Sequence, residues 1–436
     1  MFEFTTCNLR LPLAIGVLTG LLCSTESLNQ VASPTASSSR STAPSSFGWI
    51  RPVYIRSVGS SLPNNPVPND NIEQHIGAIH SKRSSLIRRK ILSLNGIKNR
   101  YYAMVDGEPT HLNVDIAAEA VHDALRKSEG VSLEDVGKLA TGTTIPDVIM
   151  PGFANLLHGK IGAQGSMDCL TAGGVCVSST NALRAATHSV TLGEHKRALV
   201  VGSEALSHVL NADRFQGFDT DARDVIDPKD AFKAEFLRYM LSDGAGCALL
   251  DIEPHPTKLS FRIERFYHHS FAHELPPCMV FGTRSAGKQA ELNDIYKFNN
   301  NQFLLMQQDT GLLNEHIIPL FKKSLLHAME EGFLGQDEQP VDWFFPHISS
   351  HFFYDETAKV AEEVLGLPKE RVWTNLSSVG NVGAASMLLL MWGALNPTNG
   401  EEAPALKKGD RVLMGIPESG NFSYHYILLT VVDKDG

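Results

Sequence analysis

The sequence lacks a cysteine framework, an excess of positive charge and any internal repeat. Its six cysteines, among 436 residues, form no CxxC pair and show no regular spacing, which argues against a disulfide framework or a zinc site and favours a reducing compartment. A formal net charge of -10 argues against nucleic acid as the main partner. Without self-similarity at a period of about 20 to 50 residues, the chain is not a solenoid.

The sequence also lacks an apolar run long enough to give a stable membrane span. The segment from Leu11 to Cys23 has 13 residues, which is too short to cross a bilayer. It resembles the core of a signal peptide, but Arg10 is the only positive charge before it. The Ser/Pro/Ala-rich stretch that follows is typical of disorder. An export signal, an organelle transit peptide and an extension without a targeting role stay open for residues 1–49, and we expect a cytoplasmic protein.

Strand-like and helix-like segments alternate after this leader. Apolar residues recur at helical spacing over 114–128, and the apolar run 197–202 before Gly/Ser is typical of a buried strand. The same rhythm returns later, with a long amphipathic helix over 312–331 and a strand over 341–346. This alternation predicts an α/β fold whose sheets are covered on both faces. We expect an N-terminal half over 50–255 and a C-terminal half over 256–436.

Cys176 is the first of three candidate catalytic residues. It lies in TAGGVCVSSTNAL, where small residues precede a helix-compatible run. A thiol at a helix N-terminus is expected to have a lowered pKa, and the neighbouring amides can bind an oxyanion. A buried structural cysteine is the alternative. Cys169, seven residues earlier, is the rival nucleophile, and we interpret it as structural.

His347 and Asn381 are the other two candidates. His347 follows the aromatic strand that ends at Pro346, a position that can present an imidazole at a sheet edge. His351, four residues later, would allow a metal pair on a helix, but no acidic residue is spaced to complete it, so we expect no metal. Asn381 lies between glycines in SSVGNVGAASM, which suits a turn that directs its carboxamide inward. A structural histidine and a capping asparagine are the alternatives.

These three segments together resemble the β-ketoacyl-acyl-carrier-protein synthase III family of the thiolase-like superfamily. The resemblance extends from about Val53 to Val432 and includes VGSSLP, NGIKNRYYA, ALVVGSE, SDGAGCALL and PESGNFSY. It implies five layers in the order αβαβα, built from two pseudo-repeated halves, and a homodimer. It also implies thioesters of an acyl carrier protein or coenzyme A as substrates, with no further cofactor.

The resemblance assigns roles to individual residues. Cys176, His347 and Asn381 fall on the family's catalytic positions. The amides of Cys176 and Gly420 fall on its oxyanion hole. Met150, in DVIMPGF, falls on the residue that reaches into the partner subunit's acyl pocket, with core packing as the alternative.

The chain departs from housekeeping members of this family where coenzyme A binds. Those members carry an aromatic residue and an arginine before the GIxxR motif, whereas this chain has Arg89, Lys90 and Leu94. The segment SKRSSLIRRK could instead dock an acidic carrier protein, and a solvated charged face is the alternative. The candidate docking residues are Lys82, Arg83, Arg88, Arg89 and Lys90.

Other features resemble one subgroup, the ketosynthases that form dialkylresorcinols and cyclohexanediones. They are an insertion from Phe215 to Arg238 and the segments FLRYMLSDGAG and SFAHELPPCM. The resemblance implies condensation of an acyl group on Cys176 with a β-ketoacyl or malonyl thioester, followed by cyclisation. Cyclisation needs a base, and Glu204 is our candidate because burial would raise its pKa toward neutrality. A glutamate that only holds backbone amides is the alternative.

The sequence also bears on several other functions. A degradative thiolase would need a second reactive cysteine near the C-terminus, and none follows Cys278. A plant-type polyketide synthase usually ends in a Gly-Pro-Gly loop, which is absent. A housekeeping initiation synthase, an ester-forming acyltransferase and a non-catalytic partner subunit stay open.

Overall fold

The computed structural model describes residues 51–436, with gaps at 80–81, 216–227, 282–304, 335–338 and 398–402. The leader, with its targeting alternatives, lies outside the described residues. Residues 48–436 form one compact unit. In the part of the chain that the structure describes, no helix has the length and apolar character needed to cross a membrane.

The centre of the fold is a nine-stranded mixed sheet in the order β13-β14-β15-β10-β1-β9-β8-β6-β7. Its strands are β1 (Tyr54–Ser61), β6 (Lys138–Gly142), β7 (Asp168–Ala172), β8 (Arg197–Glu204), β9 (Gly244–Asp251), β10 (Ser260–Ser270), β13 (Trp343–Pro346), β14 (Arg411–Glu418) and β15 (Ser423–Val432).

The strand pairing of the sheet repeats in its two halves. The series β1, β9, β8, β6 pairs antiparallel, antiparallel and then parallel, and β10, β15, β14, β13 pairs in the same order. The two series join where Tyr54 and Ile55 of β1 pair with Arg262 and Phe261 of β10. The predicted α/β class with two pseudo-repeated halves is therefore confirmed. The boundary at residue 255 falls between β9 and β10 and stays a prediction.

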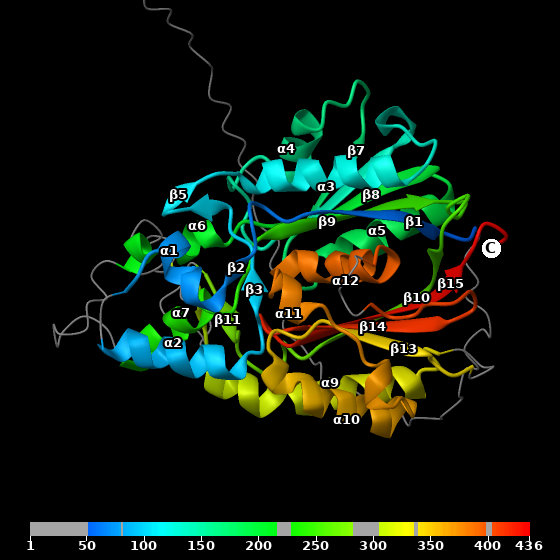
Figure 1. Ribbon diagram of the computed structural model, residues 1–436. Helices are drawn as coiled ribbons and strands as arrows, with labels where there is room; N and C mark the ends of the chain where they lie inside the picture. The colour runs from blue at the N-terminus through cyan, green and yellow to red at the C-terminus, as the bar shows by residue number, and fades with distance from the viewer. Residues whose placement is uncertain (1–50, 80–81, 216–227, 282–304, 335–338, 398–402) are drawn as a thin grey trace, which may run out of the picture. The chain divides into compact units, whose positions relative to one another are not determined.

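Helices separate and cover the two halves of the sheet, giving five layers (Figure 1). The layers contain α3 (Asn113–Lys127) and α4 (Phe153–Lys160) on one outer face, α5 (Ser178–Leu192) and α12 (Ser386–Leu395) in the centre, and α9 (Thr310–Glu330) and α10 (Tyr354–Leu365) on the other. One hydrophobic core joins Ala182 of α5 and Met387 of α12 to Val200 of β8 and Phe345 of β13. The central helices thus contact both halves of the sheet, and α12, which is apolar on all sides, is buried between them as such a helix requires.

Shorter elements surround one end of the layers. They are α1 (Ile72–Ile76), α2 (Lys82–Leu94), α6 (Ser207–Leu210), α7 (Pro228–Arg238), α11 (Leu376–Val379), β2 (Val67–Pro68), β3 (Asn99–Arg100), β4 (Met104–Val105), β5 (Glu108–Pro109), β11 (Met279–Val280), β12 (Gln307–Gln308) and the 3-10 turns η1 (Asn69–Asn71), η2 (Leu133–Asp135), η3 (Ala212–Phe215), η5 (His351–Phe353), η6 (Lys369–Arg371) and η7 (Gly383–Ala385).

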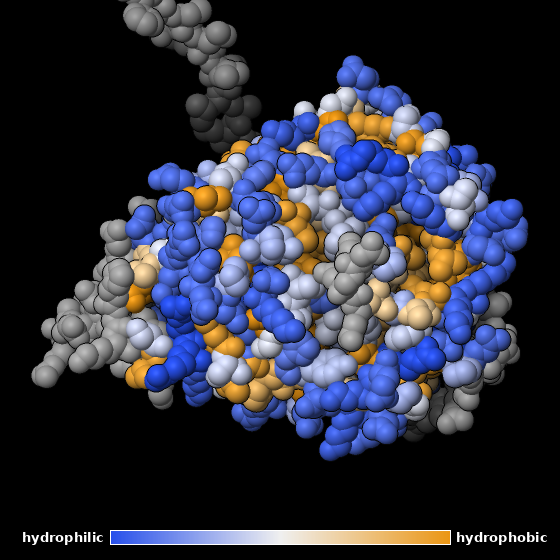
Figure 2. All heavy atoms as spheres, viewed as in Figure 1, coloured by the Kyte–Doolittle hydropathy of each residue, from blue (hydrophilic) through white to orange (hydrophobic). Residues whose placement is uncertain are grey.

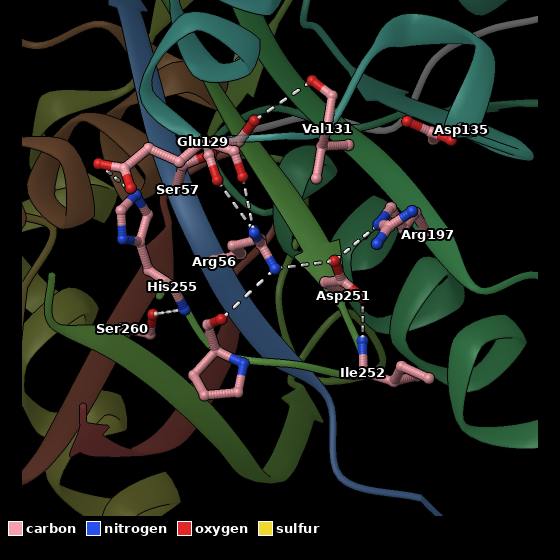
Figure 3. A network of polar contacts seen from close by, with 12 residues as sticks. Arg56, Ser57, Glu129, Val131, Asp135, Arg197, Asp251, Ile252, His255 and Ser260 are labelled. Carbon is pink, nitrogen blue, oxygen red and sulfur yellow. Dashed lines mark hydrogen bonds and ion pairs between the residues drawn. The ribbon is translucent and has the colours of Figure 1, made fainter. Parts of the chain in front are cut away.

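A buried charge network ties the N-terminal half together at the end of β9. The Asp251 carboxylate, fully buried, accepts hydrogen bonds from Arg197 at 2.6 Å and from Arg56 at 3.4 Å. Arg56 also donates to the carbonyls of Ser128 and Glu129, at 3.0 and 2.8 Å. Figure 3 shows the guanidinium of Arg56 between these groups. Each of these buried charges has a partner of opposite charge or a carbonyl, so none is left uncompensated. The contacts join β1, β8 and β9 to the end of α3.

Candidate active site

Cys176 lies in the turn between β7 and α5, as the sequence predicted. The amide of Ser178 donates to the carbonyl of Val175 at 3.2 Å, and α5 begins at Ser178. A Cβ on Gly142 of β6 would lie 2.3 Å from the Ser179 nitrogen, so strand and helix meet closely here. Cys176 is 5% exposed. The rival Cys169, on the edge strand β7, pairs with Leu139 of β6 and does not line the pockets that reach Cys176.

Two pockets meet at Cys176, and both are also lined by Ser349 and Ser419. The first, here the α9 pocket, contains His347 and the apolar side chains of Leu313, Ile317, Phe321 and Phe353. The second, here the α7 pocket, contains Asn381 together with Thr144, Phe236, Leu237 and Met240. The structure therefore places each of the other two catalytic candidates beside Cys176, in a different pocket.

A third pocket, here the entry pocket, lies between α2 and these two pockets, with which it shares lining residues. It shares Phe236 and Met240 with the α7 pocket and Phe353 with the α9 pocket. Lys90 and Leu94 of α2 also line it. The insertion predicted from the sequence thus supplies α7, whose side chains form a wall shared by the entry pocket and the α7 pocket.

His347 is positioned by the parallel pairing of β13 and β14. Its amide donates to the carbonyl of Gly415 at 2.8 Å, directly after the Pro346–Gly415 pair. The side chain is buried, and burial lowers the pKa of its imidazole to about 4. The ring is therefore neutral at pH 7, with one nitrogen that donates a hydrogen bond and one that accepts.

Asn381 is held by the turn between α11 and η7. Its carbonyl accepts a hydrogen bond from the Ser242 amide at 2.8 Å, and its side-chain oxygen accepts one from the Gly383 amide at 3.1 Å. These bonds fix the carboxamide so that its NH2 group is the part that can donate to a ligand. Gly380 and Gly383 have φ of +80° and +49°, as the predicted turn requires.

Gly420 lies beside the nucleophile turn. Its carbonyl accepts a hydrogen bond from the Cys278 amide at 2.8 Å. A Cβ on Gly420 would be 3.0 Å from Cγ2 of Val175, the residue before Cys176. The geometry therefore brings together the two residues whose amides were predicted to form the oxyanion hole.

Glu418 is a site residue that the sequence reasoning missed. Its carboxylate accepts hydrogen bonds from the amides of Val175 at 3.1 Å and Val177 at 3.4 Å, on both sides of Cys176. Burial raises the pKa of this carboxyl group. The signal available in the sequence was an acidic residue two positions before Gly420 in PESG.

The prediction that the helix terminus lowers the pKa of the Cys176 thiol is wrong. The pKa of Cys176 is raised well above its ordinary value, first by burial and then by the charges of Glu418 and Glu204. Burial disfavours the charged thiolate, and two carboxylates add like-charge repulsion. The helix terminus alone therefore does not determine the charge state of this cysteine.

Glu204 lies at the end of β8, fully buried, below the turn that carries Asn381. Its carboxylate accepts hydrogen bonds from the Ala384 amide at 3.0 Å and the Thr144 amide at 3.1 Å. Burial raises its pKa to about 7. The Thr144 hydroxyl also donates a hydrogen bond to Glu204. Thr144 lines the α7 pocket. The carboxylate thus contacts the site through Thr144 and Ala384, and its predicted catalytic role stays a prediction.

The remaining predicted residues lie outside the pockets around Cys176 or at their entrance. Met150 is 83% exposed beside Ile149, which is 79% exposed. Arg88 forms an ion pair with Glu73 at 2.8 Å and so contacts its own chain, whereas Arg89 is exposed and Lys90 lines the entry pocket. The backbone of Lys82 and Arg83 begins α2, and their side chains lie outside the described residues.

Comparison with known families gives two matches. The thiolase N-terminal domain model matches residues 108–250, and the 3-oxoacyl-[acyl-carrier-protein] synthase III C-terminal model matches residues 334–420. The first match includes Cys176 and the second includes His347 and Asn381. The β-ketoacyl-[acyl-carrier-protein] synthase III of Neisseria gonorrhoeae is 24% identical over 378 residues, which cover 86% of this chain and 98% of that protein.

Solved structures agree with this fold. The tetronic acid condensing enzyme AbyA1 superposes with a TM-score of 0.64 at 21% identity, covering 87% of this chain and 99% of that one. OleA of Xanthomonas campestris with bound lauric acid and lauroyl-CoA gives 0.65 at 19% identity, with coverage of 87% and 99%. The chain therefore matches a thiolase model in its N-terminal half and a 3-oxoacyl-[acyl-carrier-protein] synthase III model in its C-terminal half, and it shares its fold with these solved condensing enzymes.

Proposed function

We propose that this protein is a condensing ketosynthase that joins two acyl thioesters by forming a carbon–carbon bond. The observation that carries the proposal is that two pockets meet at Cys176, one with His347 and one with Asn381. A transferase that moves one acyl group to water or an alcohol needs one chain-binding pocket, whereas a condensing enzyme must hold two chains beside one nucleophile.

In the first step the Cys176 thiolate attacks an acyl thioester and the carrier thiol leaves. The amides of Cys176 and Gly420 stabilise the oxyanion that forms during this attack. Donors of this kind lower the barrier by roughly 3 kcal/mol each. The acyl chain then extends into one of the two apolar pockets.

In the second step the second thioester becomes an enolate, either by loss of carbon dioxide from a malonyl group or by loss of a proton to solvent from the carbon between the two carbonyls of a β-ketoacyl group. The enolate carbon forms a bond to the acyl carbon on Cys176 while the bond from that acyl carbon to the Cys176 sulfur breaks, and Cys176 leaves as the thiolate. His347 and Asn381 donate hydrogen bonds to the thioester oxygen of this second substrate. Because the His347 ring is neutral, with a pKa of about 4, it donates without carrying a charge of its own. We expect a β-ketoacyl or malonyl thioester as the second substrate.

The finer proposal is that the same protein cyclises the condensed product to a cyclohexanedione or dialkylresorcinol precursor. Ring closure needs a group that moves protons near pH 7. Glu204 has a pKa of about 7 and receives a hydrogen bond from the hydroxyl of Thr144, a residue that lines the α7 pocket. This contact supports a proton path from the pocket to Glu204 through Thr144.

The proposed substrates are thioesters with long apolar chains, carried by an acyl carrier protein. Apolar side chains of α9 line the α9 pocket, and the OleA structure holds lauric acid and lauroyl-CoA. Exposed Arg89 and Lys90 lie on α2 beside Leu86 and Leu94, which are 57% and 49% exposed. In Figure 2 hydrophilic and hydrophobic side chains lie side by side over this region. Such a mixed basic surface suits an acidic, partly apolar carrier.

A homodimer is part of this proposal. The exposed apolar tip formed by Ile149 and Met150 projects from the loop between β6 and α4, and contact with a second subunit would bury it. We expect Met150 to reach the partner's acyl pocket, and a side chain with that role is exposed when one chain is considered alone.

The test is to narrow each pocket separately. Ile317→Phe reduces the α9 pocket and Leu237→Phe reduces the α7 pocket, while Leu326→Phe on the exposed side of α9 is the control. Product masses are measured for acyl donors and β-ketoacyl thioesters of varied length. We expect each pocket variant to shorten the chain preference for a different substrate. If both variants shorten the same chain, or if the product is an ester, the two-chain proposal is wrong.

A further inference from the structure

The carboxyl group of Glu418 occupies an unusual position for an acid. It lies at the end of β14 and binds the two amides that flank Cys176, at 3.1 and 3.4 Å. It is 7% exposed, and among the described residues it forms no ion pair. A buried carboxylate without a cation is costly in free energy, so a position beside the nucleophile calls for a function.

Glu418 also connects the two sides of the oxyanion hole. A Cβ on Gly420 would lie 3.1 Å from one carboxyl oxygen of Glu418, and a Cβ on Gly174 would lie 3.5 Å from the other. The side chain therefore fills the space between the loop of Gly420, in the C-terminal half, and the turn of Cys176, in the N-terminal half. The two glycines leave the room that this carboxyl group needs.

We propose that Glu418 is a positioning residue that locks the Cys176 turn to the Gly420 loop and controls, by its own charge, how readily the Cys176 thiol loses its proton. This inference rests on the proposed function, because an oxyanion forms beside Cys176 only during acyl transfer. An ionised Glu418 opposes both the thiolate and the oxyanion. A protonated Glu418 opposes neither.

The charged groups around the thiol support this inference. The groups that act on Cys176 are Glu418 from β14 and Glu204 from β8, and both raise the pKa of its thiol. His347, after β13, lines the same pocket and stays neutral because its pKa is about 4. Among the described residues no cation offsets these charges at the thiol, so an ionised Glu418 disfavours the thiolate. Glutamine at position 418 keeps a side chain of similar size and removes the charge.

The test follows alkylation of Cys176 by iodoacetamide in the full-length protein as a function of pH, with the modified peptide identified by mass. Glu418→Gln should move the midpoint of the profile to lower pH by about one unit, because a like charge near the thiolate is removed. Glu362→Gln, an exposed carboxylate of α10, is the matched control and should leave the midpoint unchanged.

Glu418→Asp keeps the charge but shortens the side chain, so its midpoint should stay at the wild-type pH. The wild-type midpoint itself should lie above the ordinary thiol value of about 8.5, and a midpoint at or below that value would overturn the inference even where the glutamine variant does not fold. An unchanged or higher midpoint in Glu418→Gln would overturn the inference. Alkylation needs no acyl donor, so a failure of the proposed condensation would show in product assays and leave this result intact.

Discussion

The carboxylate of Glu204 accepts a hydrogen bond from the backbone amide of Ala384 at 3.0 Å. This contact ties the end of β8 to the turn that carries Asn381, since Ala384 follows Asn381 by three residues. A Cβ on the intervening Gly383 would lie 2.9 Å from the same carboxylate, so the turn packs directly on Glu204. Glu204, which we predicted as a base, therefore also supports the position of Asn381, the candidate catalytic amide.

Glu204→Gln separates these two roles. The glutamine oxygen can still accept the hydrogen bonds of Ala384 and Thr144, but the amide cannot take up a proton near pH 7. We expect condensation to continue while the uncyclised product accumulates, as measured by product mass. Glu204→Ala should also slow condensation, because the Asn381 turn loses its support. Normal ring formation by Glu204→Gln would exclude Glu204 from proton transfer.

Gly420→Ala should damage the oxyanion hole. The added methyl group would meet Cγ2 of Val175 at 3.0 Å and a carboxyl oxygen of Glu418 at 3.1 Å, so the loop must move. Misplacement of one oxyanion donor should slow acyl loading about tenfold or more. Gly159→Ala in α4, where a methyl meets nothing within 4 Å, is the control. Equal loading rates for both variants would show that the Gly420 amide is not used.

The sequence predicted the fold class and the three principal side chains because each leaves a local signal. Small residues around Cys176, the strand that ends at Pro346 and the glycines around Asn381 all describe turns at strand or helix ends. Glu418 left a weaker signal, because its role depends on a contact with Val175 and Val177, more than 240 positions away. A local sequence pattern cannot predict a contact between residues so far apart in the chain.

The pockets were also beyond the reach of sequence patterns. The α9 pocket consists of helix residues that sequence periodicity identifies only as buried, such as Ile317 and Phe321. These side chains lie near Cys176 because α9 packs on the C-terminal half of the sheet. Likewise, the sequence shows the insertion before SDGAG, but only the fold places Phe236 and Met240 in a shared pocket wall.

Asp251→Ala should destabilise the protein strongly. The substitution leaves the guanidinium groups of Arg56 and Arg197 without their shared carboxylate, and such uncompensated buried charge costs about 3 to 5 kcal/mol. The free energy of unfolding, measured by urea titration, checks this value. Asp433→Ala, which removes a surface ion pair with Lys408, should hardly change the midpoint. Equal shifts in the two variants would contradict the structural role of the network.

Acidification should destabilise the fold through His268 and His425. Their rings face each other across β10 and β15, with centroids 4.0 Å apart. Burial first, then the neighbouring charges of Arg184 and His188, lowers the pKa of His268 to about 4. Burial, His268 and Arg184 lower that of His425 to about 2. The stability that these neutral rings allow is present above about pH 6.5 and is lost as the pH falls below it, because the unfolded chain then binds more protons.

His425→Gln should therefore make the stability less dependent on pH. Between about pH 6 and pH 5 the free energy of unfolding of the variant should fall less steeply than that of the wild type, by up to about 1.4 kcal/mol per pH unit. Urea titrations at a series of pH values measure both slopes. Parallel slopes for variant and wild type would mean that His425 does not contribute to the acid sensitivity.

In the proposed mechanism Cys176 carries the acyl group and His347 acts only after loading. These two roles are separated by the intact-protein mass after incubation with a medium-chain acyl thioester, followed by addition of a β-ketoacyl thioester. We expect the acyl mass on the wild type and on His347→Ala, no added mass on Cys176→Ala, and condensed product from the wild type alone. An adduct on Cys176→Ala, or normal product from His347→Ala, would contradict the account.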